Sequence, residues 1–209
     1  VTLRRLLTHR AGLNGEAIGA WGETGIGPST TEMLKGLTSC GVVIPPDSQH
    51  KYSNLAFILL GQVISRVSGI PYSEYIATQI FGPLGMSSST YNPDDSTLAK
   101  AIHYHRPVME DVPVKAHRLT HNARRPGGGI YSTVADLAKW LSQQFRTGIM
   151  MNRGSDQVLS GKSLEEMHQP LFVEPDWNSG QCLGWRALRI GDKIHLGHGG
   201  GNAGSASQT

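Results

Sequence analysis

The sequence predicts an α+β fold in which helices flank an antiparallel sheet and a mainly helical lobe stands beside it. Apolar residues recur at helical spacing in several segments before residue 87, and a strand-turn-strand pattern follows residue 181. The chain has 209 residues, of which 38% are hydrophobic and 17% charged, so it can bury a core and falls in the globular class. We expect residues 1–132 to form the mainly helical lobe and residues 133–209 to contribute a helix and a hairpin to the sheet.

Both ends of the chain are expected to be cuts in a longer protein. The chain begins at Val1 within a helical pattern and stops at Thr209, just after a glycine-rich turn. A single domain, truncated at both ends, is the expected organisation. The predicted sheet would then have an exposed edge.

The first predicted helix covers residues 2–8 and ends before Gly12, which is typical of a helix C-terminus. Residues 15–27 are rich in glycine and aperiodic, which indicates a surface loop. Ser29 and Glu32 have the spacing of a capping box and predict a second short helix.

The longest helical pattern follows a proline turn and begins near Tyr52. Gly69 ends this helix, and Pro71 begins another that stops at Gly82 and Pro83. One face of the long helix is apolar, with residues at helical spacing. That face comprises Leu55, Ile58, Leu59, Val63, Ile64 and Val67.

Residues 87–128 have weak periodicity and many turn formers, so a long excursion is expected there. Thr133 and Asp136 then predict the start of an amphipathic helix. We expect its apolar stripe to be core, with Phe145 continuing the apolar face. The stripe comprises Val134, Leu137 and Leu141.

Ser163 and Glu166 predict the start of another short helix. Residues 182–190 and 193–196 then read as two strands joined by Gly191-Asp192, a two-residue hairpin signal. This hairpin would deliver His198 to the end of a strand.

Charge and cysteine content exclude several function classes. The net charge is +3 with a pI near 9.0, and residues 115–125 hold most of the local excess. A solvated loop is favoured there over a nucleic-acid surface, because no aromatic residues are interleaved with the basic ones. Cys40 and Cys182 could form at most one disulfide, and two ordinary buried thiols are expected. No apolar run is long enough to span a bilayer, and the compartment stays open.

The segment Tyr52-Ser53-Asn54 is the first candidate for chemistry. It follows a proline turn and precedes a helix, so the phenol of Tyr52 could project into a cleft. Residues two apart in extended chain share a face, which would place Asn54 beside Tyr52. The alternative is an ordinary helix N-terminus with Asn54 as its cap.

The second candidate is His198-Gly199-Gly200-Gly201, at the predicted end of a hairpin strand. Glycines let a backbone approach a ligand closely, so such a strand can present N–H groups to an acyl oxygen. The alternative is a flexible loop at a strand end.

Seven segments in the same order together resemble the β-lactamase-related proteins of the class C type and the penicillin-binding proteins, a family that includes esterases, D-aminopeptidases and carboxypeptidases. They span almost the whole chain, which makes their combination far more specific than any one of them. The segments are residues 1–13, 52–54, 67–69, 81–86, 127–133, 183–185 and 198–200.

The resemblance implies a β-lactamase/transpeptidase-like fold and roles for these residues. Tyr52 would be the tyrosine of the family's Y-x-N motif, which moves a proton between nucleophile, leaving group and water, and Asn54 would hold the acyl amide of the substrate or the lysine. His198, Gly199 and Gly200 would occupy the strand of the K-T-G motif, with histidine in place of lysine. The N–H of Gly201 would be one oxyanion donor.

The chain departs from the family at the nucleophile. The S-x-x-K helix is expected upstream of Val1, so the nucleophilic serine is absent from these residues. The one literal match, Ser48 to Lys51, lies in the turn that leads to Tyr52, and we do not expect Ser48 to be the nucleophile.

Other patterns are weaker candidates. Residues 160–163 imitate the end of a phosphate-binding loop but lack its glycine spacing. His103 with His105, and His117 with His121, could ligate zinc, but exposed loop histidines are favoured. No cofactor and no metal are expected.

The resemblance therefore implies a serine hydrolase that cleaves an ester, amide or β-lactam bond through an acyl-enzyme, with this chain alone inactive. Its partner would be a small-molecule or peptidyl acyl substrate, and neither nucleic acid nor a membrane span is expected. The rival hypothesis is a non-catalytic protein of the same fold that binds peptidoglycan or a protein partner. A histidine at position 198 slightly disfavours an efficient β-lactamase. Both enzyme and rival require Tyr52 and Gly201 to line one cavity.

Overall fold

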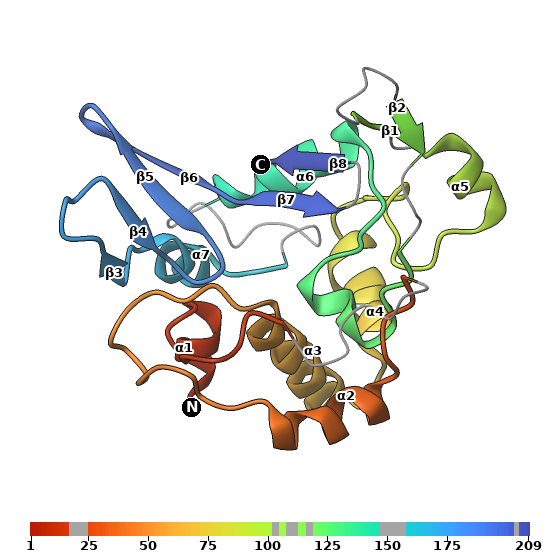
Figure 1. Ribbon diagram of the computed structural model, residues 1–209. Helices are drawn as coiled ribbons and strands as arrows, with labels where there is room; N and C mark the ends of the chain where they lie inside the picture. Colours follow the sequence, from red (N-terminus) through yellow and green to blue (C-terminus); the bar gives the residue numbers. More distant parts are fainter. Residues whose placement is uncertain (17–24, 102–104, 108–112, 116–118, 147–157, 203–204) are drawn as a thin grey trace.

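The computed structural model describes residues 1–16, 25–101, 105–107, 113–115, 119–146, 158–202 and 205–209 (Figure 1). Within these residues, helices dominate the first part of the chain and antiparallel strands the last part, so the predicted α+β class is confirmed. The predicted loop at residues 15–27 lies largely outside the described residues.

The predicted helices after Thr2, Ser29 and Ser53 begin with side-chain caps that satisfy their free N–H groups, whereas the helix after Pro71 has no side-chain cap. Ser29 and Glu32 form both halves of a capping box. Gly69 ends the long helix in a left-handed conformation, with φ of 77°. The elements are α1 (Leu3–Leu7), α2 (Thr30–Gly36), η1 (Leu37–Ser39), α3 (Asn54–Ser68), α4 (Tyr72–Ile76), the π-helical turn η2 (Ala77–Phe81) and α5 (Asp95–Lys100).

The helix α3 is the centre of this part, since two apolar clusters share it. Leu55 and Ile58 pack with Met33 of α2, and Ala56 packs with Leu6 of α1. On another side of α3, Gly61 lies in close contact with Pro126. A Cβ on Gly61 would come within 2.0 Å of the Pro126 ring. Pro126 belongs to η3 (Asn122–Gly127), so this contact holds η3 against α3.

The expected excursion at residues 87–128 contains α5, η3 and a small hairpin, and residues 102–104, 108–112 and 116–118 lie outside the described residues. The hairpin strands are β1 (His105–Pro107) and β2 (Pro113–Lys115). An isolated bridge between Thr90 and Tyr131 ties the excursion to the segment before α6.

The second part is a four-stranded antiparallel sheet, in the order β3-β4-β5-β6, packed against two helices. Trp185 and Ala187 of the sheet region form an apolar cluster with Trp140 and Met167 of the helices. The elements are α6 (Val134–Gln144), α7 (Gly161–His168), β3 (Phe172–Val173), β4 (Ser179–Gln181), β5 (Arg186–Ile190) and β6 (Lys193–Gly197).

The predicted hairpin is confirmed, but its first strand was predicted too long. Gly191 and Asp192 join β5 to β6, and Ile190 pairs with Lys193. Residues 182–185 are instead a turn between β4 and β5, because the N–H of Cys182 bonds to the carbonyl of Trp185. After His198, the chain continues as β7 (Gly199–Asn202), which pairs with β8 (Ser205–Gln208).

The prediction for the apolar stripe of α6 was wrong at Val134, which is 85% exposed, and Phe145 is 83% exposed. The helix turns polar side chains inward, and Asp136 is the main one. Its carboxylate accepts from the Ser88 N–H at 2.8 Å and the Ser89 hydroxyl at 2.9 Å, and it pairs with Lys139. A buried carboxylate with these partners is stable, so α6 is anchored by polar contacts.

Two predicted helix starts need a correction or an addition. Ser160, three residues before Ser163, caps α7 through the Ser163 N–H. Residues 160–163, which imitate the end of a phosphate-binding loop, are thus the start of a helix, and its cap is a hydrogen bond between Ser160 and Ser163. At α6 the predicted cap Thr133 is confirmed, but the side chain of Asp136 is used by residues 88 and 89.

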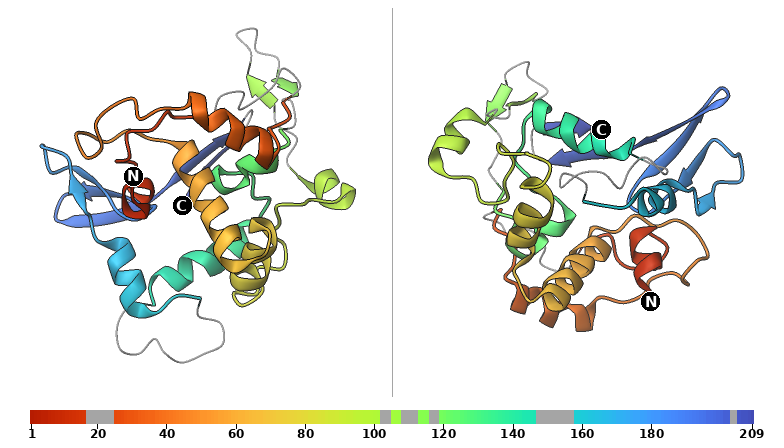
Figure 2. Two further views of the ribbon diagram at one scale, coloured as in Figure 1. Left: turned by 90° about the horizontal axis from the view of Figure 1, so that it is seen from below. Right: turned by 180° about the vertical axis from the view of Figure 1, so that it is seen from behind.

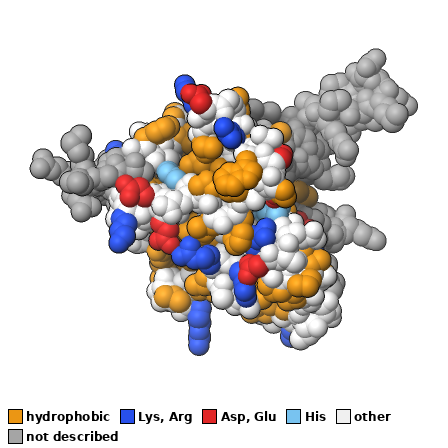
Figure 3. All heavy atoms as spheres, turned by 90° about the vertical axis from the view of Figure 1, so that its left-hand side faces the viewer, with side chains coloured by type: hydrophobic (Ala, Val, Ile, Leu, Met, Phe, Trp, Pro, Cys, Tyr) orange, Lys and Arg blue, Asp and Glu red, His pale blue; other side chains and the backbone are white. Residues whose placement is uncertain are grey.

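Figures 1 and 2 show the sheet with α6 and α7 on one side of the molecule and α1, α2 and α3 on the other. The proposed boundary between residues 132 and 133 stays a prediction, and Trp140 packs against clusters from both sides of it. Figure 3 faces the side where β3–β6 lie and shows apolar side chains among charged ones. The exposed apolar side chains of this sheet region are Val173, Trp177, Leu188, Ile190 and Ile194.

Both cysteines carry free thiols, with Cys182 buried and Cys40 partly exposed. Among the described residues, no single helix has the length and apolar character to cross a bilayer, although Asn54–Ser68 and Tyr72–Phe81 meet that standard together as a pair bent by 80°.

Candidate active site

A cavity of about 1580 Å³ lies between the helical part and the β7–β8 hairpin. Residues of both candidate motifs line it. They are Tyr52, Asn54, His198, Gly199, Gly200 and Gly201. Two segments far apart in sequence therefore meet, as required, and the rings of Tyr52 and His198 lie with centroids 6.2 Å apart.

Tyr52 is held in place by His9, which follows α1. The His9 carbonyl accepts from the Lys51 N–H at 2.9 Å, and its Nδ1 accepts from the Ser53 N–H at 3.1 Å. Its ring also lies 4.3 Å from the Tyr52 ring, centroid to centroid. His9 thus contacts three consecutive residues and fixes where the phenol of Tyr52 emerges.

The environment of His9 keeps its imidazole neutral. The side chain is 2% exposed, and the backbone has φ of 53°, a conformation that costs energy for a residue with a Cβ. Burial, followed by the nearby His50 and His198, lowers its pKa to about 3. A neutral imidazole can keep Nδ1 as the acceptor for Ser53.

Ser53, and not Asn54, caps α3. The Ser53 hydroxyl accepts from the Ala56 N–H and donates to the Asn14 carbonyl at 2.6 Å. The alternative reading of Asn54 as the cap is therefore wrong. Its side chain is left for the cavity, where Oδ1 accepts from the Tyr52 hydroxyl at 3.2 Å.

Asn54 also contacts a carboxylate that belongs to a different segment. Its Nδ2 donates to Glu16 at 2.5 Å, and the other Glu16 oxygen pairs with Arg124 at 2.7 Å. Burial, followed by the charge of Glu16, raises the pKa of Tyr52 above its ordinary value. The phenol is consequently neutral at physiological pH.

The strand β7 presents backbone groups to the cavity. His198 and Thr209 exchange both main-chain hydrogen bonds, at 3.1 and 3.2 Å. Antiparallel pairs alternate between bonded and non-bonded, so Gly201, opposite Ala206, is a non-bonded position. The N–H of Gly201 therefore points away from β8, and no other described strand pairs with β7.

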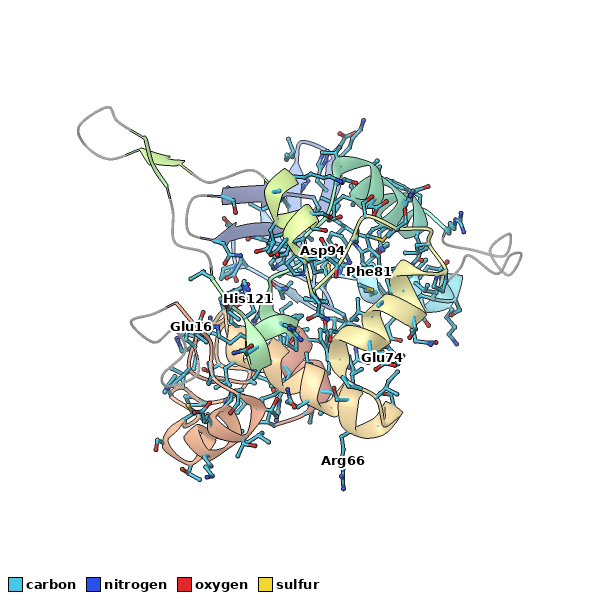
Figure 4. All side chains as sticks on the ribbon, turned by 90° about the vertical axis from the view of Figure 1, so that its right-hand side faces the viewer. Glu16, Arg66, Glu74, Phe81, Asp94 and His121 are labelled. Atoms are coloured by element: carbon cyan, nitrogen blue, oxygen red, sulfur yellow. The ribbon has the colours of Figure 1, made fainter. Side chains whose placement is uncertain are left out.

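A glycine turn and a histidine close the cavity beside β7. Gly129 has φ of 92°, and a Cβ there would come within 2.6 Å of the His121 ring. His121 hydrogen-bonds to the Asn202 side chain at the end of β7. Burial and the nearby Arg124 lower the pKa of His121. Figure 4 labels His121, Glu16 and Asp94, which line the cavity from three different segments.

Other sequence candidates lie elsewhere. The Ser48 hydroxyl donates to the Pro45 carbonyl in an exposed turn and does not line the cavity. His103 and His117 lie outside the described residues, and His105 is described only by its backbone. The interpretation of residues 115–125 as a solvated loop is wrong at Arg124, which is 5% exposed and bound to Glu16.

Three residues of the site were missed from the sequence: His9, Glu16 and Arg124. His9 stands in the segment 1–13 that carried part of the resemblance, which is the signal that could have found it. Nothing in the sequence pattern links Glu16 to Arg124, since they are 108 positions apart.

Comparison with known proteins shows which family this chain resembles. The family model described as Beta-lactamase matches residues 1–207. The D-alanyl-D-alanine-carboxypeptidase/endopeptidase AmpH of Escherichia coli (strain K12) is 32% identical over 145 residues, which are 68% of this chain and 36% of that protein. Penicillin-binding protein 4 of Amycolatopsis lactamdurans is 24% identical over 188 residues, 88% of this chain and 48% of that protein.

Solved structures agree on the fold. The octameric penicillin-binding protein homologue from Pyrococcus abyssi superposes with a TM-score of 0.77 at 25% identity, over all of this chain and 48% of that one. A penicillin-binding protein from Bacillus halodurans gives 0.79 at 22% identity, over 100% of this chain and 63% of that one. The chain therefore has the β-lactamase/transpeptidase-like fold.

The chain belongs to the Beta-lactamase family, as its resemblance implied. It spans less than half the length of the two curated relatives described above.

Proposed function

We propose that the full-length protein containing this chain is a serine hydrolase that cleaves an ester, amide or β-lactam bond through an acyl-enzyme. The observation that carries this proposal is the meeting of Tyr52 and Asn54 with the strand Gly199–Asn202 across one cavity. An acyl-transfer site needs a group that handles protons and donors aimed at an oxyanion, and these two segments supply both.

Tyr52 is the proposed proton-transfer group. It would take the proton of the serine as Oγ attacks the carbonyl carbon, and return it to the leaving group as the scissile bond breaks. Water would then attack the acyl-enzyme by the same route in reverse, releasing the acid and restoring the serine. A phenol that is neutral before the reaction, as its raised pKa favours, can serve in this exchange only with a partner that draws off its proton.

Asn54 and the glycine strand are proposed to hold the substrate. Asn54 would bind the acyl amide through the Nδ2 hydrogen that Glu16 does not use. Gly199 and Gly200 would lie along the acyl group, and the Gly201 N–H, which points away from β8, would donate to the oxyanion. His198 would occupy the position of the family's lysine, beside Tyr52.

The nucleophile is proposed to come from an S-x-x-K helix outside residues 1–209. Ser48 begins the single S-x-x-K match within the chain, and its place in an exposed turn away from the cavity argues against it. The lysine of such a helix would be the partner that draws the proton from Tyr52.

A hydrolysis assay on the full-length gene product tests this function. Nitrocefin, a p-nitrophenyl ester and a D-alanyl peptide should be offered in parallel, and we expect turnover of at least one. The variants Ser48→Ala and serine-to-alanine in the upstream S-x-x-K should be compared. Activity lost with Ser48→Ala would contradict the proposed nucleophile.

Absence of turnover on all three substrates, with an upstream sequence that lacks S-x-x-K, would contradict the enzyme and support the rival binding protein. The chain 1–209 alone should be inactive in the same assay. Hydrolysis by this chain alone would likewise overturn the proposal of an external serine.

A further inference from the structure

Four side chains from three segments form one continuous chain of polar contacts that ends at Tyr52. The Tyr52 hydroxyl donates to Asn54 Oδ1 at 3.2 Å, Asn54 Nδ2 donates to Glu16 Oε1 at 2.5 Å, and Arg124 Nη2 donates to Glu16 Oε2 at 2.7 Å. Asn54 begins α3 and Tyr52 lies two residues before it, Glu16 lies in the loop after α1, and Arg124 lies in η3. The sequence motifs include Tyr52 and Asn54 but not Glu16 or Arg124, so they do not indicate these contacts.

We propose that Glu16, held by Arg124, is a positioning residue that fixes the orientation of the Asn54 amide and thereby the direction in which Tyr52 donates its proton. The proposal rests on the proposed function, since it concerns how the same site is set for proton transfer.

Hydrogen-bond chemistry dictates the orientation. An ionised carboxylate can only accept, so the Asn54 amide must turn its Nδ2 toward Glu16. Its Oδ1 is then directed at Tyr52 and can only accept, so the phenol must donate to it. In the resting site the lone pairs of the phenol oxygen are therefore directed to the cavity, where they can accept a hydrogen bond from a nucleophile. The phenol takes the proton of the nucleophile only when its own proton passes to the lysine of the proposed S-x-x-K helix.

Without the carboxylate, the amide could rotate by half a turn. Its Nδ2 would then donate to the phenol oxygen and occupy a lone pair, and the phenol hydrogen would turn elsewhere. The direction of proton transfer at Tyr52 would no longer be set. Glu16 therefore determines which atom of Tyr52 faces the reacting groups.

Arg124 holds Glu16 in this position. Glu16 is 44% exposed, whereas the guanidinium side chain of Arg124 is 5% exposed and packs against Gly27. Charge-assisted bonds are shorter and stronger than neutral ones, so the buried partner restrains the exposed one. The helix η3 packs on α3 through Gly61 and Pro126, so the element that carries Arg124 lies against the helix that begins at Asn54.

Other titratable groups face this chain of contacts. The rings of His9 and His198 lie against Tyr52, and His121 lies close to Arg124. His9 stays neutral because of its burial. Glu16 is accordingly the negative group that acts on the phenol, and Arg124 is the positive group that offsets it.

The test compares Glu16→Gln and Arg124→Met in the full-length protein. Glu74→Gln and Arg66→Met are the matched controls, because both residues are exposed, neither lines the cavity, and Figure 4 labels them away from Glu16. Carbon NMR of isotope-labelled tyrosine reports the titration of Tyr52, which the variant Tyr52→Phe assigns. This readout needs no substrate.

We expect Glu16→Gln to lower the pKa of Tyr52 and Arg124→Met to raise it, each by on the order of one pH unit, while both controls leave it unchanged. Opposite directions identify the two charges as acting on the phenol, since a merely structural loss would shift both the same way. In the hydrolysis assay we expect kcat to fall by up to about 100-fold in Glu16→Gln, with a smaller change in KM.

Unchanged titration of Tyr52 in a folded Glu16→Gln protein, together with unchanged kcat, would overturn the positioning role. A protein without any hydrolytic activity would instead count against the proposed function, and the NMR titration would still decide the role of Glu16. If Arg124→Met does not fold, the exposed Glu16→Gln alone decides the matter by its direction of shift.

Discussion

The two segments that meet at the cavity are held by different kinds of interaction. Tyr52 and Asn54 are fixed by side chains from elsewhere in the fold, namely His9 and Glu16. Gly199–Asn202 is held by main-chain pairing with β8, and its first three residues are glycines without side chains. A group that must move a proton needs an oriented side chain, whereas a donor to an oxyanion needs an oriented backbone.

The largest expected effect is at the side-chain segment. Tyr52→Phe should lower kcat of the full-length enzyme by about 10²- to 10⁴-fold, because it removes the proposed proton-transfer group. The hydroxyl makes its contact at an exposed position, so the thermal midpoint should change little. Steady-state kinetics and a melting curve measure both, and activity within threefold of wild type would exclude Tyr52 from the chemistry.

The backbone segment should respond only to loss of an N–H. Gly201→Pro removes the proposed oxyanion donor without taking a hydrogen bond from β8, and should lower kcat by about 10²- to 10³-fold. Gly201→Ala retains the N–H, and its Cβ would meet only Ser205 O at 3.9 Å. Kinetics of the pair test the idea, and equal losses in both variants would refute a role for the N–H.

A smaller effect should follow from loosening the support of Tyr52. His9→Phe keeps a ring but removes the acceptor of the Ser53 N–H, and Ser53 is 2% exposed. We expect the free energy of unfolding to fall by about 1–3 kcal/mol. Chemical denaturation measures it, with the exposed His195→Phe as the control, which should stay within about 0.5 kcal/mol of wild type. Equal free energies of unfolding for the two variants would show that His9 does not support Tyr52.

The pH dependence of stability should report the same buried histidine. The pKa of His9 is lowered to about 3 in the folded protein, below its unfolded value near 6.5. Between these values the unfolded chain binds a proton that the folded chain does not, so stability falls as the pH decreases. The slope from His9 is about 1.4 kcal/mol per pH unit at most.

Denaturation curves at several pH values between 4 and 7, roughly the window set by these pKa values, should therefore converge for wild type and His9→Phe as the pH decreases. His195→Phe should track wild type throughout. A constant difference between wild type and His9→Phe would mean that His9 titrates normally.

Local patterns predicted much of the fold. The caps at Ser29 and Thr133, the glycine end at Gly69 and the two-residue turn at Gly191-Asp192 are each determined by neighbours within a few residues. The errors arose where a distant partner decides. Val134 is exposed because Asp136 turns the opposite face of α6 inward toward Ser88 and Ser89.

The sequence by itself determined most of the helices, the hairpin, the family and the two motifs at the cavity, because each is written in residues that are close together in the chain. The helices α5 and η3 were not predicted. Only the tertiary structure decided that His9 supports Tyr52 and that Glu16 and Arg124 orient Asn54. These contacts join segments that the chain order separates, and a hydrogen bond between distant residues leaves no periodic pattern in the sequence. The packing of η3 on α3, through Gly61 and Pro126, is what brings them together.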